Sequence, residues 1–506
     1  MAQTSGMEKP DLNRRAVMAA LGLTAASPLL WACGGGGGEA GGAGVSSSSS
    51  SSSSLFAVAA PAVNDPLLFD IHRRAFNLFW DRGDTTFGLV PDRTPTASAA
   101  SIAGVGFQLT ANVIGVMNAY VSRSDAAART ATTLRHMWNA PQGPDATGMA
   151  GHHGFFYHFL AIDTGLRDGA SEISSIDTCL FLMGALTAAQ YFDGADATET
   201  EIRTLAQSIH ERVDWTWLLK PDGAIGHGWT PESGFISYEW TGFNEAMMVY
   251  LLAMASPTFP VPASAWDVWT STYDTTYGTW MGQTYLGFPA LFVQQFNACW
   301  FDFRGIADAY MRGKGLDYFE NTKRATLAQR EYARQNPGGF TGYGADMWGF
   351  TACDGPADAT IAGRTYKTYA ARGMAINGGF DDGTIAPWAS LSSLPFTPGE
   401  TWQAVQTLKA RYGADIYGTY GFYDAFNPTY TGATATGRIT ASAGWVGKDW
   451  IALDTGPVLA MLENYMTGRL WALTRASPIL RLGLQKSRGS RPRPPPGHGF
   501  LKRLWL

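Results

Sequence analysis

The sequence predicts an all-α fold, built as a toroid of helical hairpins with short β-hairpins on its loop side. Between residues 65 and 474, apolar residues recur about every 3.6 positions, as in helices, and loops rich in Gly, Trp and Asp separate these stretches. The pattern gives about a dozen helices, more than a simple bundle needs. Some helices are apolar all round and others on one face only, which indicates an inner and an outer ring.

The clearest helical periodicity lies within residues 68–79, 113–120 and 202–217, where large apolar residues return every three or four positions. The stretches 154–159 and 223–229 combine glycine with aromatic or β-branched residues and are expected to form hairpins on the loop side. No repeat of fixed period is present in the sequence. Further helices are expected at 176–191, 244–255, 264–273, 290–299, 304–312, 318–335, 398–412 and 455–474.

The first 64 residues have the composition of an export signal followed by a tether. Residues 1–33 contain Arg14 and Arg15, an apolar run and Cys33, and residues 34–64 are rich in Gly and Ser. The arginine pair resembles a twin-arginine signal, and the residues that end at Cys33 resemble a bacterial lipobox. The apolar run is shorter than the roughly 20 residues that span a bilayer. We expect an exported, periplasmic or cell-surface protein, attached to a bacterial membrane through a lipid on Cys33.

The rest of the composition excludes several classes of protein. The chain has 506 residues, of which 45% are hydrophobic, and its formal net charge of -5 gives no bias toward nucleic acid. Its four cysteines show no paired spacing, so no disulfide framework is inferred. The segment 475–506 carries eight Lys or Arg and no acid, and is expected to be disordered.

One segment places an acid where an apolar helix begins. Glu245 is expected in the first turn of that helix, with Trp240 and Phe243 close to it in the sequence. Aromatic neighbours desolvate a carboxyl group and raise its pKa, as a general acid near neutral pH requires. The alternative is an ordinary first-turn acid, stabilised by the helix dipole.

A second acidic segment precedes another buried helix. Ser174 or the next residue is expected to cap this helix, Asp177 lies in its first turn, and Glu172 comes just before the cap. The helix dipole favours an ionised Asp177, whereas desolvation favours a protonated Glu245, and this difference separates a base from an acid. A capping cluster without chemistry is the alternative. If the two helix starts line one cleft, Glu245 and Asp177 are the predicted catalytic pair.

Short motifs follow one another along the body of the chain, at 79–81, 88–93, 154–159, 174–178, 242–247, 300–305, 351–356, 381–387, 420–426 and 454–457. Together they resemble the glycoamylase-like family, which includes bacterial endo-β-1,2-glucanases and a domain of cyclic β-1,2-glucan synthases. The resemblance covers nearly all of residues 65–474 and implies an (α/α)6 toroid with its active site on the hairpin face.

The resemblance also implies roles for single residues. Glu245 matches a carboxylate proposed for catalysis, and Asp177 matches the second acid of a D-x-x-E-T motif in the endo-β-1,2-glucanases. The first acid of that motif falls on Ser174 here, which is a departure from the family pattern. The acids to test as its substitute are Glu172, Asp382 and Asp424.

Several other residues are candidate ligands of a sugar. Trp348 lies in a glycine-rich loop, where it either stacks on a sugar ring or pins the loop. Asp302 and Arg304 form either a salt bridge or a pair that binds hydroxyl groups. The residues predicted to bind substrate are Glu172, Trp240, Asn244, Asp302, Arg304, Trp348, Asp382, Tyr423 and Asp424.

No cofactor or metal is expected. His152, His153 and His158 lie close together, but no motif such as H-E-x-x-H accompanies them, and nucleotide or acyl chemistry lacks its usual motifs. The sequence therefore predicts a glycoside hydrolase of a β-glucan or related oligosaccharide, with β-1,2-glucan favoured. The alternatives are a carbohydrate-binding lipoprotein without turnover and a glycan-remodelling transglycosylase.

Overall fold

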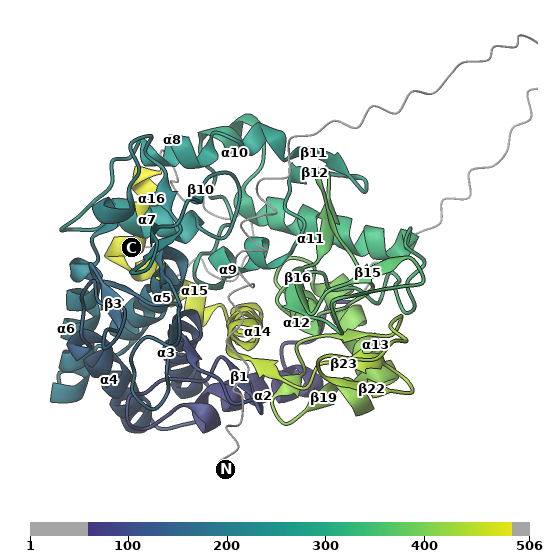
Figure 1. Cartoon of the computed structure of the whole chain (residues 1–506), viewed down its shortest axis with the longest axis horizontal. Helices are drawn as coiled ribbons and strands as arrows, with labels where there is room; N and C mark the ends of the chain where they lie inside the picture. The colour runs from purple at the N-terminus through teal and green to yellow at the C-terminus, as the bar shows by residue number, and fades with distance from the viewer. Residues whose placement is uncertain (1–58, 488–506) are drawn as a thin grey trace, which may run out of the picture.

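The structure, a computed structural model, describes residues 59–487, and its helices form the predicted (α/α)6 toroid (Figure 1). The predicted export signal, Cys33 and most of the tether therefore lie outside the described residues. Six largely buried helices form an inner ring, and six helices with one exposed face alternate with them along the chain. The inner helices are α3 (Ile102–Met117), α5 (Ser175–Tyr191), α7 (Met247–Ala255), α9 (Phe292–Trp300), α12 (Pro387–Leu391) and α14 (Ala452–Met466). The outer helices are α2 (Pro66–Arg82), α4 (Arg123–Asn139), α6 (Ala197–Arg212), α8 (Ala265–Thr270), α11 (Tyr318–Gln335) and α13 (Pro398–Ile416).

Inner helices α3 and α5 pack with their backbones in close approach. A Cβ atom on Gly106 would lie 2.2 Å from the carbonyl oxygen of Leu180, and one on Gly184 would lie 2.0 Å from the carbonyl oxygen of Gly106. Only glycine fits at these two positions. Both helices are buried over most of their length, as their nearly continuous apolar sequences predict.

Most of the predicted helices are present, with local corrections. Helix α4 was missed because its buried face consists mainly of Ala and Thr, which give a weak hydrophobic signal although Ala favours helices. The helix predicted at 304–312 is shortened to α10 (Ala309–Gly313). The helix predicted at 455–474 is two helices, α14 and α15 (Arg469–Ala476), because Gly468 takes a left-handed conformation with φ 66°.

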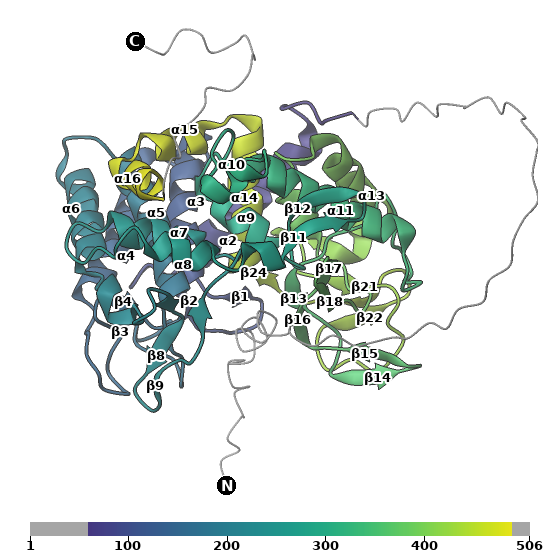
Figure 2. The ribbon, with the colours of Figure 1, turned by 90° about the horizontal axis from the view of Figure 1, so that it is seen from above.

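The short strands gather at one end of the helix layer, as the predicted hairpins required (Figure 2). Each predicted hairpin stretch contributes to two sheets: 154–159 to β3–β4 and β2–β5, and 223–229 to β7–β10 and β6–β8–β9. All the strand pairs are antiparallel. The strands on the N-terminal side of α9 are β1 (Arg93–Thr94), β2 (Ala100–Ser101), β3 (Gly151–His152), β4 (Phe155–Phe156), β5 (Phe159–Leu160), β6 (Ile173–Ser174), β7 (Ile225–Gly226), β8 (Gly228–Thr230), β9 (Gly234–Phe235), β10 (Glu239–Trp240), β11 (Tyr277–Trp280) and β12 (Gln283–Leu286). Those that follow are β13 (Ala352–Asp354), β14 (Ala359–Ile361), β15 (Arg364–Tyr366), β16 (Tyr369–Ala371), β17 (Gly373–Ala375), β18 (Gly378–Phe380), β19 (Tyr417–Gly418), β20 (Gly421–Phe422), β21 (Phe426–Asn427), β22 (Arg438–Thr440), β23 (Gly444–Val446) and β24 (Trp450–Ile451).

The prediction of a disordered tail from residue 475 is wrong for its first part. Residues 475–487 complete α15 and form α16 (Pro478–Lys486), which packs against α7. A Cβ atom on Gly483 would lie 2.4 Å from the carbonyl oxygen of Leu251, so the two helices touch closely there. The prediction rested on the basic composition of the segment and overlooked Leu480, which is buried. Residues 488–506 lie outside the described part.

Two further features of the described residues bear on the predictions. Cys179, Cys299 and Cys353 are buried free thiols, so the cysteines described here form no disulfide. Within residues 59–487, no helix combines the length and the apolar character needed to cross a bilayer.

Candidate active site

A cavity of about 550 Å³ lies where the inner helices α7, α9, α12 and α14 begin, on the strand end of the toroid. Helix N-terminal ends carry the positive end of the helix dipole, which favours anionic groups in such a cavity. Its wall combines carboxyl groups, one imidazole and several aromatic rings. The lining residues are Asp92, His158, Phe159, Glu245, Phe292, Phe296, Ala352, Tyr369, Trp388, Ile451, Leu453 and Asp454.

Glu245 lies in this wall, as the sequence predicted. It is 4% exposed and occupies the turn just before α7, not the first turn of the helix. Burial, and then the charge of Glu245, raise the pKa of the Cys179 thiol, so Glu245 is close to inner helix α5. The rings that surround it in the cavity wall include Phe292 and Trp388.

The two acidic segments predicted to converge do meet, through the strand residues between them. Ser174 in β6 pairs with Gly228 in β8. The hydroxyl of Ser175 donates to the carbonyl oxygen of His227 at 2.9 Å, and the indole N–H of Trp240 donates to the same hydroxyl at 2.9 Å. This network holds the start of α5 against the strand that leads to Glu245.

Trp240 and Asn244 support this segment and are not among the lining residues of the cavity. The ring of Trp240 stacks on His227 with a centroid distance of 3.7 Å. The side chain of Asn244 accepts a hydrogen bond from the backbone N–H of Ala246 at 2.9 Å and donates to the carbonyl oxygen of Thr241 at 3.0 Å. Both side chains therefore fix the turn that carries Glu245, and the prediction that they bind substrate has no support from their positions.

Asp177 is fully buried and does not line the cavity. Ser174 caps α5, because its hydroxyl oxygen accepts the backbone N–H of Asp177 at 3.2 Å, and its O–H donates to the Asp177 carboxylate at 2.5 Å. Asp177 was predicted to activate water either directly or through a hydroxyl group of the substrate. Because Asp177 lies behind the wall, its position gives no support to the direct route, and its role as the base stays a prediction.

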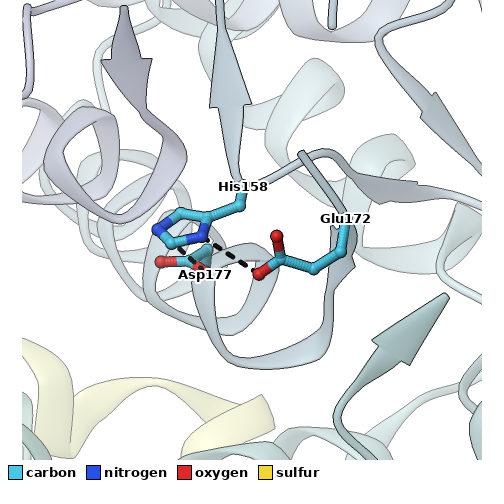
Figure 3. A group of neighbouring side chains, drawn as sticks. All are labelled: His158, Glu172 and Asp177. Atoms are coloured by element: carbon cyan, nitrogen blue, oxygen red, sulfur yellow. Dashed lines mark hydrogen bonds and ion pairs between the residues drawn. The ribbon is translucent and has the colours of Figure 1, made fainter. Parts of the chain in front are cut away.

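His158 connects Asp177 to the cavity. The Nδ1 atom of His158 lies 3.0 Å from a carboxylate oxygen of Glu172, and its Nε2 atom lies 3.8 Å from a carboxylate oxygen of Asp177 (Figure 3). Of the three acids considered as substitutes for the missing motif acid, Glu172 is the one in this cluster. The imidazole lines the cavity, and the two carboxylates hold it from either side.

These three side chains could also be considered as metal ligands. Each offers one ligand atom, and the three atoms lie within 4.8 Å of one another. Among the described residues, this is the group with such an arrangement. One metal ion binds only one nitrogen of an imidazole ring, whereas the two carboxylates lie nearest to opposite nitrogens. The observed arrangement therefore fits an ion-paired histidine better than a metal site. The prediction that no metal is bound stays a prediction.

A second cavity of about 350 Å³ shares Trp388, Ile451 and Asp454 with the main cavity. Tyr423 and Asp424, both predicted to bind substrate, lie in its wall. The ring of Tyr423 stacks on that of Trp450 at a centroid distance of 4.3 Å, and Asp424 accepts the backbone N–H of Asp354 at 2.8 Å. These two predicted residues thus lie beside the main cavity.

Asp302 and Arg304 form a salt bridge at the other end of α9. Both side chains are joined by two hydrogen bonds of 2.7 Å, and Arg475 in α15 also contacts Asp302. Phe292 at the start of α9 lines the cavity, whereas this ion pair follows the last residue of the helix. These positions give no support to the prediction that Asp302 and Arg304 bind substrate, and the ion pairs connect α9 to α15.

Trp348 and Asp382 are structural as well. Trp348 is fully buried and packs in a cluster with Tyr332 and Phe350, so it cannot stack on a sugar. Asp382 accepts two hydrogen bonds of 2.8 Å from Arg372, and both side chains are fully buried. Their local sequences resemble binding loops, but tertiary packing places them inside.

Sequence reasoning missed most of the lining residues, among them Asp92, Asp454 and Trp388. Asp92 lies before β1, and its carboxylate is 3.5 Å from Arg93, which also binds Asp354 at 2.8 Å. Asp454 is the third residue of α14, after the N-cap residue Ile451, and it lines both cavities. Trp388 follows an unremarkable Ala-Pro sequence. The resemblance motifs at 88–93 and 454–457 were the available signal for the two acids.

The fold and the cavity define a class of protein, the (α/α)6 toroids that carry a carboxylate-lined aromatic cavity at the start of their inner helices. Comparisons with known proteins test the predicted resemblance. Residues 237–478 match a glycoamylase family model described as "Putative glucoamylase". Together with the relatives described next, this match confirms the predicted resemblance to the glycoamylase-like proteins.

Individual relatives agree with this assignment. The chain is 26% identical over 465 residues to an exo β-1,2-glucooligosaccharide sophorohydrolase of Parabacteroides distasonis; the match covers 85% of this chain and 59% of that protein, so the chain spans well under two thirds of that relative's length. An endo-β-1,2-glucanase structure from Chitinophaga pinensis is 26% identical with a TM-score of 0.72, and covers 85% of this chain and 99% of its own. A structure from Bacteroides uniformis that shares the glucoamylase description is 28% identical with a TM-score of 0.73, and covers 85% of this chain and 98% of its own.

Proposed function

We propose that the protein is a glycoside hydrolase that cleaves a β-glucan by carboxylate acid and base catalysis. The observation that carries the proposal is the position of Glu245 in the wall of the main cavity, together with Asp92 and Asp454. Aromatic rings such as Trp388 offer apolar faces to sugar rings, and carboxylates accept hydrogen bonds from sugar hydroxyl groups. This combination is the one that hydrolysis of a glycosidic bond requires.

Glu245 is the proposed general acid. It is 4% exposed and shares the cavity wall with aromatic residues, an environment that disfavours the charged form of a carboxyl group. A carboxylic acid kept protonated near neutral pH can give its proton to the leaving glycosidic oxygen. Glu245 lies just before the first residue of α7 and lines the cavity. In this proposal the glycosidic oxygen of a bound substrate lies next to its carboxyl group.

Asp454 is the proposed second carboxylate, in place of Asp177. It lies in the first turn of α14, where the helix dipole favours a carboxylate, and it lines both cavities. Asp92 is the other acid in the wall, but the guanidinium group of Arg93 lies 3.5 Å from it and makes it a weaker proton acceptor. Asp454 would activate the attacking water, or act as nucleophile, on the side of the sugar opposite Glu245.

The substrate favoured by this proposal is β-1,2-glucan. Two relatives support it, because one is named a β-1,2-glucooligosaccharide sophorohydrolase and the other an endo-β-1,2-glucanase. One of these acts from a chain end and the other within the chain, so the size of the product distinguishes the two modes for this protein. Glu172, which we propose as the substitute for the motif acid that Ser174 replaces, lies 3.0 Å from His158.

Export with a lipid on Cys33 is also part of the proposal. It is supported by Arg14 and Arg15, the apolar run that follows and the cysteine that ends it. Fractionation and labelling with a radioactive fatty acid in a bacterial host test it: Cys33→Ala should lose the label and leave the membrane fraction. A label retained in this variant would contradict lipidation at Cys33.

The test of activity incubates the purified full chain with β-1,2-glucan and with β-1,3-, β-1,4- and β-1,6-linked glucans, and measures reducing ends. Glu245→Gln and Asp454→Asn should each lose at least about 100-fold in kcat, because removal of an acid or base has effects of this size. Glu239→Gln is the matched control, since Glu239 lies in the same segment and pairs with Lys220 at 2.8 Å away from the cavity. It should keep the wild-type kcat.

The products separate the remaining alternatives. Binding of glucans without release of reducing ends would contradict the hydrolase and favour a carbohydrate-binding lipoprotein. Longer or cyclic products, without a net gain of reducing ends, would favour a transglycosylase. Asp177 would be the general base if Asp454→Asn kept full activity while Asp177→Asn was inactive at normal stability.

A further inference from the structure

His158 has an unusual setting, because an ionisable carboxylate lies against each of its two ring nitrogens (Figure 3). The side chains of His158, Glu172 and Asp177 are 10%, 14% and 0% exposed. Three ionisable groups in so little contact with water carry a desolvation cost of several kcal/mol per ion. A pair of apolar side chains would fill the same space without that cost, so the cluster calls for a role beyond packing.

The geometry favours a charged imidazole. In a neutral imidazole one nitrogen carries a lone pair, and here that lone pair would face a carboxylate oxygen. With a proton on both nitrogens, the ring donates to Glu172 over 3.0 Å and stays in ion-pair range of Asp177 at 3.8 Å. Ser174 donates a hydrogen bond to Asp177 and so fixes the carboxylate that faces Nε2.

The charge of this ring matters because His158 also lines the main cavity. The titratable groups that share the cavity wall with it are Asp92, Glu245, Tyr369 and Asp454. Among the described residues of that wall, His158 carries the one basic side chain. Because its two N–H groups face Glu172 and Asp177, an imidazolium here acts on the sugar through its positive charge, which attracts the oxygen atoms of the hydroxyl groups.

We propose that His158 is a substrate-binding residue that meets the sugar as an imidazolium, and that Glu172 and Asp177 are positioning residues that hold its charge and orientation. The proposal rests on the glycoside hydrolase function for its substrate class, but the state of the ring does not depend on turnover. It also gives the buried Asp177 a role that a general base assignment cannot give it.

The state of the ring is measured first, by ¹⁵N NMR of the histidine side chains in the full chain carrying Glu245→Gln. The resonances of His158 are assigned by their loss in His158→Gln, among the eight histidines of the sequence. Both nitrogens of His158 should carry protons at pH 7. His153 is the internal comparison, because it lies at the surface with one carboxylate, that of Asp214, at 3.5 Å.

Binding and kinetics measure what the charge does. His158→Gln should weaken binding of β-1,2-gluco-oligosaccharides by about tenfold, because the cavity wall loses the positive charge of the ring. Glu172→Gln should make KM rise between pH 6 and pH 8, as the less firmly held imidazole loses its proton, whereas the wild-type KM stays flat. His153→Gln is the matched control and should leave both affinity and pH profile unchanged.

Three results would overturn the proposal. One is a neutral His158 ring at pH 7. Another is a KM of Glu172→Gln that follows the wild type from pH 6 to pH 8 in a variant with the wild-type unfolding midpoint, which would leave the cluster a structural role. The third is stoichiometric binding of Zn²⁺ or Mn²⁺ that removes a ring proton of His158, which would make the cluster a metal site. If the ring is charged but no glucan is cleaved, the proposed function fails and the charged cluster remains.

Discussion

Replacement of Asp382 by Asn should unfold the protein more easily without changing its affinity for substrate. Arg372 and Asp382 are both fully buried and joined by two hydrogen bonds of 2.8 Å. Burial works against a charged guanidinium, but Asp382 more than offsets it and raises the pKa of Arg372 above its ordinary value. Asn at position 382 leaves this cation buried without its counter-ion.

The magnitude follows from that geometry. Breaking a buried ion pair by removing one partner costs about 3 to 5 kcal/mol. With an unfolding entropy of about 2.1 cal/mol/K for each of the roughly 430 described residues, this cost lowers the unfolding midpoint by roughly 3 to 6 °C. Arg372 keeps its hydrogen bonds to the carbonyl oxygens of Cys353 and Lys367, which limits the loss.

Thermal unfolding and KM of Asp382→Asn, measured together, test this reasoning. Asp358→Asn is the control, because Asp358 is exposed in the same part of the chain and should leave the midpoint within about 1 °C. The double variant Arg372→Met with Asp382→Asn should be less destabilised than the sum of the single variants, since the unpaired cation is gone. A wild-type midpoint with a raised KM in Asp382→Asn would refute the structural assignment and restore Asp382 as a substrate ligand.

Three further predictions concern stability. Burial lowers the pKa of His210 to about 4, so this ring is neutral in the folded protein while it titrates near its ordinary pKa of 6.5 in the unfolded chain. Its contribution is therefore complete above about pH 6.5 and is lost as the pH falls toward 4, by about 3 kcal/mol in all; urea unfolding against pH should show this loss, and His210→Leu should flatten it. A wild-type slope in His210→Leu would assign the acid sensitivity to other groups. Trp348→Ala should lower the free energy of unfolding by about 3 to 5 kcal/mol by opening a cavity in the core, with KM unchanged; a raised KM at normal stability would mean that the ring contacts substrate. Gly483→Ala should detach α16 from α7, since the new Cβ would lie 2.4 Å from the carbonyl oxygen of Leu251, although Ala favours a helix by about 1 kcal/mol over Gly. Limited proteolysis should then cut the C-terminal segment faster, and an unchanged rate would argue against the packing of that segment.

The helical rings and the position of Glu245 could be read from the chain because both depend on local patterns. An inner helix such as α5 is nearly continuous in apolar residues, and an outer helix such as α11 alternates with period 3.6, so the two rings are visible before any contact is known. Glu245 comes directly before a run of apolar residues that forms an inner helix, so the sequence alone places it at the start of that helix. Helix α4 escaped detection because its buried residues are mostly small.

The sequence by itself determined the fold class, the family resemblance and one acid of the site. Only the tertiary structure decided which of the other polar residues share a wall with that acid, because this depends on where segments far apart in the chain are brought. Asp382 pairs with Arg372, Asp302 pairs with the distant Arg475, and Asp177 lies behind His158. Asp92 and Asp454 reach the same cavity although they are far apart in the chain. The local sequence around a carboxylate does not show whether its partner is a buried arginine, an imidazole or a sugar. The packing of the folded chain determines which partner lies next to it.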